Sequence, residues 1–233
     1  MIQVTQLSKR YGSRWVLRDL NLEIPDGRFV ALLGANGAGK TTLLRILATL
    51  LHPTSGYVTI NGFELPQQAP MVRHTIGLVA HQPLLYSELT AEENLRFYAR
   101  LYGIENSSKQ IGASLELTGL SSRRNDLVRT FSRGMQQRLA IGRALLHQPA
   151  VLLLDEPYTG LDEDACRRLD DLLRHVTSLG RTILMASHDL LRAEALADRF
   201  DVLTRGSISA FCDKSSLPSG GIMAFYRSAV EMG

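Results

Sequence analysis

A glycine-rich segment at residues 34–41 constrains the fold more than any other part of the chain. It reads Gly-Ala-Asn-Gly-Ala-Gly-Lys-Thr and lies between an apolar run at 29–33 and a helix-like run at 42–51. Its three glycines let the backbone curl until successive N–H groups point inward, toward one anion. The following helix presents its positive N-terminal end to the same charge. This strand, loop and helix order predicts a binding site for the phosphates of a nucleoside triphosphate.

Individual side chains of this phosphate loop have expected roles. Lys40 can reach the β- and γ-phosphates, and the Thr41 hydroxyl can ligate Mg²⁺. The alternative, an ordinary glycine-rich turn, does not account for the upstream strand, the lysine and the threonine in one register. The residues that we expect to contact the nucleotide here are Gly34, Asn36, Gly37, Ala38, Gly39, Lys40, Thr41 and Thr42.

The composition predicts a globular protein with room for one large α/β domain. The 233 residues are 45% hydrophobic and 21% charged, and the net charge is +3. Cys166 and Cys212 are isolated, which favours reduced thiols and no disulfide. The sequence contains no run of 18 apolar residues and no basic-then-apolar start. We therefore expect the chain to reach a membrane only through a partner, and we expect no nucleic-acid partner.

The pattern of apolar residues predicts the fold class. Alternation up to residue 24 indicates antiparallel strands, and a hairpin is expected around Asn61-Gly62. Later strands alternate with helices, which indicates a mostly parallel sheet with its ligand site at the carboxyl ends of the strands. From about residue 84 the apolar residues recur at helical spacing, and few residues are β-branched. We predict one domain over 1–233: an α/β phosphate-loop fold with an N-terminal antiparallel β subdomain and an inserted helical subdomain at about 84–148.

Polar residues at the ends of other strands complete the candidate site. Asp155 follows the apolar run 151–154, where a carboxylate can hold Mg²⁺, and Glu156 can polarise the attacking water as a general base. The alternative for this pair is a cap on the following helix. Gln82 could contact the metal or its water, and His188 could stabilise charge on the γ-phosphate. A lone glutamine at a strand end is also typical of a surface, and a lone histidine is often structural.

These segments, in this order, resemble the ATP-binding cassette (ABC) ATPase family over nearly the whole chain. The resemblance identifies Gln82 with the family's Q-loop glutamine, 160–162 (Gly-Leu-Asp) with its D-loop, and His188 with its switch histidine. Tyr11 matches the aromatic residue that stacks on adenine in this family. The resemblance thus implies that ATP and Mg²⁺ are the cofactors, with Asp162 near the nucleotide.

The segment 131–138, which we call the signature segment, decides the resemblance. It reads Phe-Ser-Arg-Gly-Met-Gln-Gln-Arg, whereas the family usually has Leu-Ser-Gly-Gly-Gln. Ser132 and Gly134 are kept, and they suffice to place a hydroxyl and a bare N–H at a helix start. Phe131, Arg133 and Met135 depart from the pattern: Met135 removes a side-chain amide that could contact the nucleotide, and Arg133 adds a charge. In isolation the segment would also suit an ordinary serine-capped helix.

The resemblance also implies partners. In this family two cassettes sandwich two ATP molecules, so a second ATPase subunit, identical or related, is expected. The leading hypothesis is the nucleotide-binding subunit of a prokaryotic exporter, located at the cytoplasmic face of the membrane on a transmembrane permease. The signature variant and the stretch 89–95 look most similar to haem exporters of cytochrome c maturation. Multidrug or lipid exporters, a soluble repair or translation ATPase, and a regulatory ATP-binding module are the alternatives.

The helical insertion offers a docking face for that permease. It contains more aromatic residues than a small subdomain needs to bury, although most of them also suit a core. The candidate residues are Leu84, Leu85, Tyr86, Leu89, Leu95, Phe97, Tyr98, Leu101 and Tyr102.

Overall fold

Two β-sheets of different character form the frame of the computed structural model, which describes residues 1–232. The smaller sheet is antiparallel. Its strands, in spatial order, are β2 (Arg14–Ile24), β1 (Ile2–Tyr11), β4 (Ser55–Ile60) and β5 (Phe63–Leu65). The predicted hairpin joins β4 to β5 through Asn61 and Gly62, both with positive φ, as a tight turn of this kind requires. The predicted antiparallel N-terminal subdomain is thereby confirmed.

The larger sheet has six strands and is parallel except at one edge. Its spatial order is β10 (Ser207–Asp213), β9 (Arg199–Thr204), β3 (Phe29–Leu33), β8 (Thr182–Ser187), β7 (Val151–Asp155) and β6 (Ile76–Val79). Only β10 runs antiparallel to its neighbour. The strands β3, β7 and β8 are buried along their whole length, as expected for parallel strands covered on both faces.

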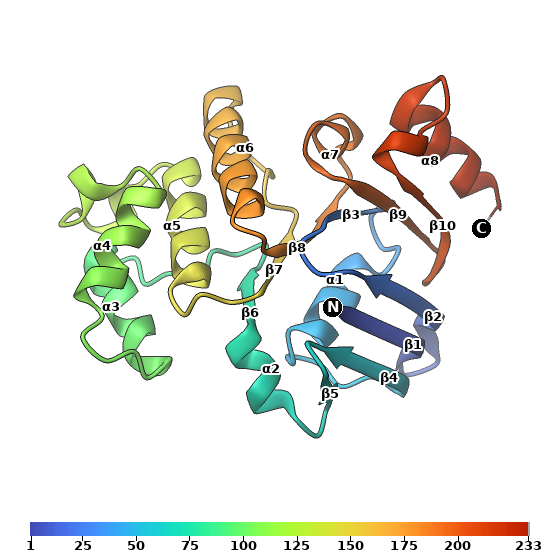
Figure 1. Ribbon diagram of the computed structural model, residues 1–233, viewed down its shortest axis with the longest axis horizontal. Helices are drawn as coiled ribbons and strands as arrows, with labels where there is room; N and C mark the ends of the chain where they lie inside the picture. The colour runs from blue at the N-terminus through green and yellow to red at the C-terminus, as the bar shows by residue number, and fades with distance from the viewer. Residues whose placement is uncertain (233) are drawn as a thin grey trace.

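Eight α-helices surround these sheets. They are α1 (Lys40–Leu47), α2 (Ala69–Thr75), α3 (Ala91–Leu101), α4 (Ser108–Leu117), α5 (Arg133–Leu145), α6 (Glu163–Ser178), α7 (Leu190–Leu196) and α8 (Gly221–Met232), within the described residues 1–232. Short 3₁₀ turns lie at Ser121–Arg123, Val128–Thr130 and Lys214–Ser216. Figure 1 shows α3, α4 and α5 gathered at one end of the molecule, opposite the antiparallel sheet.

The core divides at the larger sheet. Along β3, Val30 and Leu32 pack with α1 and the antiparallel sheet, whereas Phe29, Ala31 and Leu33 pack with helices α5 to α8. A third apolar cluster lies within the helical part and joins α3, α4 and α5. The alternating side chains of a strand thus assign one layer to each face, with the phosphate loop emerging at the end of β3.

Two helices differ from the sequence prediction. Helix α1 ends at Leu47 rather than near residue 51, because Thr49 adopts a left-handed φ of 62° and Leu50 N–H bonds back to Arg45 O at 2.8 Å. This is the geometry of a Schellman-type helix end, here without the usual glycine. Helix α2 was not predicted, since it is short and buries only Val72.

One acidic side chain on β9 is completely buried. Asp201 accepts hydrogen bonds from Arg199 at 3.0 and 2.9 Å, but its second oxygen, Oδ2, has no hydrogen-bond partner. Burial raises the pKa of Asp201 to about 6, while Arg199 lowers it and Asp213 raises it. The unpartnered oxygen is where a proton would be held.

This burial predicts a specific pH dependence. Relative to an Asp201→Asn variant, the parent should lose stability as the pH rises from about 4 to about 6, because the folded chain alone holds the proton in that window. The difference in free energy of unfolding should change by about 3 kcal/mol, at about 1.4 kcal/mol per pKa unit, and then level off. Urea titrations at several pH values measure it. A difference independent of pH would contradict the burial argument, and Asp171→Asn, which changes an exposed carboxylate, is the control.

Candidate nucleotide-binding and hydrolysis site

The loop between β3 and α1 has the backbone needed to enclose phosphates. Gly37 and Gly39 adopt positive φ values of 83° and 117°. A Cβ on Gly39 would come within 2.8 Å of the Leu17 side chain and 3.0 Å of the Val16 carbonyl oxygen, so only glycine fits. No side chain caps the start of α1. Its first N–H groups are therefore free to bind an anion.

A cavity of about 290 Å³ opens beside this loop. It contains most of the predicted phosphate-loop residues together with the proposed general base. Its lining is Arg14, Val16, Ala35, Asn36, Gly37, Gly39, Lys40, Thr41, Thr42 and Glu156. Sequence reasoning missed Arg14 and Val16, although they lie on the same β1–β2 hairpin as Tyr11.

Lys40 is held inside the loop by carbonyl oxygens. Its buried ammonium donates to Gly34 O at 2.6 Å and Ala35 O at 3.3 Å, and lies 3.4 Å from Glu156 Oε1. Phosphate oxygens carry full charge and are stronger acceptors than these neutral carbonyls. The lysine can therefore turn to a bound polyphosphate without leaving a buried position.

Thr41 and Asp155, the two residues predicted to hold Mg²⁺ from α1 and β7, are in direct contact. The Thr41 hydroxyl donates to Asp155 Oδ1 at 3.0 Å, which brings together two oxygens from the start of α1 and the end of β7. Burial raises the pKa of Asp155, and the bond from Thr41 opposes that rise. Hydroxyl and carboxylate oxygens are the ligands that Mg²⁺ prefers. Residues 1–232 contain no cluster of three or more acidic, histidine or cysteine ligands. The Thr41–Asp155 pair alone suits Mg²⁺, because this ion usually takes few protein ligands besides phosphates and waters.

Glu156 and His188 form a pair at the ends of neighbouring strands β7 and β8. His188 Nδ1 lies 2.8 Å from Glu156 Oε2, and the Glu156 N–H donates to Ala186 O at 3.0 Å. The other carboxylate oxygen, Oε1, makes no hydrogen bond and is ion-paired with the Lys40 ammonium at 3.4 Å. Glu156 also has a left-handed φ of 52°, a conformation that is sterically costly for a residue with a side chain. Once Lys40 turns to a bound phosphate, Oε1 can accept a proton from a water molecule in the cavity.

Gln82 and Tyr11, which were also predicted to contact the nucleotide or its metal, do not line this cavity. Gln82 follows β6 in an exposed bend. Tyr11 ends β1 with 48% of its surface exposed and is not part of the cavity wall. The Lys9 ammonium lies 5.2 Å from the centre of its ring. An exposed ring at this place is available for stacking, but its contact with adenine stays a prediction.

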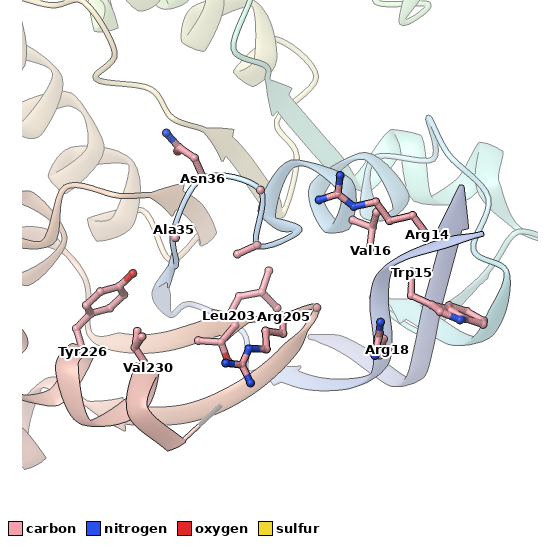
Figure 2. Close-up of a pocket in the computed structure, with 14 residues that line it drawn as sticks. Arg14, Trp15, Val16, Arg18, Ala35, Asn36, Leu203, Arg205, Tyr226 and Val230 are labelled. Carbon is pink, nitrogen blue, oxygen red and sulfur yellow. The ribbon is translucent and has the colours of Figure 1, made fainter. Parts of the chain in front are cut away.

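A larger cavity of about 510 Å³ adjoins the phosphate loop on its outer side. Figure 2 shows Arg14 reaching toward the loop, with Arg205 below it and Tyr226 on the opposite wall. Arg14, Arg18 and Arg205 all line this cavity. Three cationic side chains beside the loop favour an anionic ligand.

The signature segment lies on a different surface. Ser132 caps α5 by accepting from the Met135 N–H at 3.3 Å. A Cβ on Gly134 would lie 2.6 Å from Ala165 Cβ, so this glycine allows α5 to approach α6. The Asp162 carboxylate caps α6 by accepting a hydrogen bond from the Ala165 N–H at 2.7 Å. Ser132, Gly134 and Asp162 line a cavity of about 420 Å³ that contains no residue of the phosphate loop.

Comparison with known proteins decides the family. Residues 17–159 match the family model described as ABC transporter. This chain belongs to that family. The predicted fold class is confirmed by a solved dimeric structure of an ATP-binding cassette in a post-hydrolysis state, bound to ADP and Pi. It is 28% identical with a TM-score of 0.83, covering 92% of this chain and 99% of that one. The chain is an ATP-binding subunit of the ABC transporter type and an ATP hydrolase.

Two curated relatives are similar to this ABC ATPase over most of its length. The linearmycin resistance ATP-binding protein LnrL of Bacillus subtilis (strain 168) is 33% identical over 221 residues, covering 94% of this chain and 71% of the relative. The Nod factor export ATP-binding protein I of Cupriavidus metallidurans is 38% identical over 208 residues, covering 88% of this chain and 69% of the relative.

Proposed function

We propose that this ABC ATPase drives export through a separate transmembrane permease, at the cytoplasmic face of a prokaryotic membrane. The observation that carries the hydrolytic part is the arrangement of Lys40, Glu156 and His188 around one cavity. The names of the two relatives, one for antibiotic resistance and one for export, support the direction of transport. None of the helices within residues 1–232 is long and apolar enough to cross a bilayer.

The geometry supports a defined division of labour. Lys40 and the free N–H groups of α1 bind the phosphates, and Thr41 with Asp155 would hold Mg²⁺. Bound Mg²⁺ supplies charge neutralisation at the phosphate oxygens. Glu156 orients a water and accepts its proton through Oε1, which makes no hydrogen bond and is released from its ion pair when Lys40 binds a phosphate. His188 orients Glu156 through the 2.8 Å contact and is placed to donate to the γ-phosphate.

We propose that a second ATPase subunit completes the site, either another copy of this chain or a close relative. Ser132 and Gly134 line a different cavity from the phosphate loop of their own chain, so they are free to contact a nucleotide held by another subunit. The dimeric form of the solved cassette supports this arrangement. We further propose that residues 1–233 are one ATPase domain, with the helical subdomain at about 84–148.

The proposed permease contact lies on the exposed aromatic residues of the helical part. Tyr86 and Phe97 are 48% and 37% exposed, and their rings meet edge-on with centroids 4.9 Å apart. Leu84 and Leu101 are also exposed, whereas Leu95 is buried. An apolar patch of this kind is typical of a surface that receives a partner.

The cargo is not encoded in the nucleotide site. Haem export remains a prediction from the signature variant and is not supported by the names of the relatives. Those names favour a different compound, such as an antibiotic or a Nod factor. We therefore favour a drug-type or lipid-type exporter over a haem exporter.

The docking proposal predicts the effect of added charge. Tyr86→Glu with Phe97→Glu should reduce cofractionation with permease-containing membranes by at least about tenfold, because burying an unpaired carboxylate is costly. The ATPase rate of the purified chain should stay within about twofold. Leu179→Glu, which changes an exposed leucine at the end of α6, is the matched control. Unchanged membrane association in a folded double variant would show that this surface does not bind the permease.

A further inference from the structure

A network of charged side chains links α6 and α7 outside the nucleotide cavity. Its centre is Arg192 on α7, which is 19% exposed. The guanidinium lies 3.3 Å from Asp170 and 2.6 Å from Glu163, both on α6. It also lies 3.5 Å from Asp189, which caps α7. One arginine thus joins three carboxylates from two helices.

The network reaches the chain on both sides of the catalytic pair. Tyr158, two residues after Glu156, donates its hydroxyl to Asp170 Oδ1 at 2.6 Å. Asp189 directly follows His188. Burial and the neighbouring Asp170 raise the pKa of Tyr158, so its hydroxyl remains a neutral donor. Arg192 therefore connects the segment carrying Glu156 with the segment carrying His188.

The local backbone explains why such a connection matters. Glu156 has a left-handed φ of 52°, a conformation that persists only where the surrounding structure holds it. Its carboxylate must keep both the 2.8 Å contact of Oε2 with His188 and the orientation of Oε1 toward the phosphate cavity. Tyr158 is 9% exposed and lies under the Arg192 guanidinium, 5.4 Å from ring centre to Cζ. Displacement of either segment would misdirect the proposed base.

We propose that Arg192 is a positioning residue for hydrolysis: it holds Tyr158 through Asp170, and α7 through Asp189, so that Glu156 and His188 stay in register. Arg192 itself does not line the phosphate cavity. The inference rests on the proposed roles of Glu156 and His188. If the inference holds, loss of Arg192 slows the chemical step. Nucleotide binding is kept, because the phosphate loop belongs to a different part of the chain.

The test is steady-state hydrolysis by the purified full chain with ATP and Mg²⁺. Arg192→Ala should lower kcat by about 10- to 100-fold, the scale expected for a misplaced catalytic group. The KM for ATP and the affinity for a fluorescent ATP analogue should stay within about twofold. Arg192→Lys keeps a cation that can reach Asp170 but lacks the planar fork, so it should recover part of the lost rate. Arg174→Ala, whose partner Asp171 is exposed, is the matched control and should keep the parental kcat.

A second variant covers the case in which Arg192→Ala does not fold. Tyr158→Phe removes one hydroxyl and keeps the buried ring, and it should lower kcat in the same selective manner. Parental kcat in folded Arg192→Ala or in Tyr158→Phe would overturn the inference. Equal losses of ATP affinity and kcat would also overturn it, since they indicate general destabilisation. If the parent and Glu156→Gln hydrolyse ATP at the same rate, the proposed catalytic role of Glu156 is wrong, and the Arg192 inference falls with it.

Discussion

Replacing Glu156 with glutamine should lower kcat for ATP hydrolysis by at least about 100-fold, the range in which loss of a general base falls. The amide has nearly the same shape as the carboxylate, so the contact with His188 at 2.8 Å can be kept in part. It cannot accept the proton of the attacking water. Phosphate release by the purified chain measures the effect.

ATP binding should survive in Glu156→Gln and become tighter. The substitution removes a negative charge from the wall of the phosphate cavity, which relieves repulsion of the triphosphate. Since cleavage no longer empties the site, the proposed closed dimer should accumulate when ATP is added. Light scattering after gel filtration, with and without ATP, detects it. Glu64→Gln, an exposed glutamate on β5, is the control. Hydrolysis at the parental rate would refute the assignment of Glu156.

The nucleotide site could be predicted because its chemistry is local in the sequence. The phosphate loop, its lysine and its threonine are contiguous, and Asp155 and Glu156 directly follow an apolar run. Parallel strands bring their carboxyl ends to one edge, so Thr41 and Asp155 were expected to meet. In the structure the Thr41 hydroxyl donates to Asp155 at 3.0 Å, whereas their shared role toward Mg²⁺ stays a prediction.

Features that depend on contacts between distant segments could not be read from the pattern. The link from Tyr158 through Asp170 to Arg192 joins positions up to 34 residues apart, and no periodicity marks it. Within the docking candidates, helical spacing did not separate buried Leu95 from exposed Phe97, because both suit an apolar face. Helix α1 was predicted too long because a threonine, not a glycine, provides its left-handed end.

Replacing Lys40 with methionine should weaken ATP binding by about 10- to 100-fold, corresponding to loss of one charge-assisted contact of about 1.5–3 kcal/mol. Methionine keeps most of the length and burial of the side chain, so the packing of α1 should remain intact. Without the ammonium, Glu156 loses the cation 3.4 Å away, and two carbonyl oxygens of the loop lose their donor. The phosphate cavity then becomes more negative just where the triphosphate must enter.

Isothermal titration with ATP and Mg²⁺ measures the affinity, and thermal unfolding confirms that the fold is kept. Lys109→Met, on an exposed position of α4, should bind ATP as the parent does. Parental affinity in Lys40→Met would mean that the helix N-terminus and backbone amides alone account for phosphate binding.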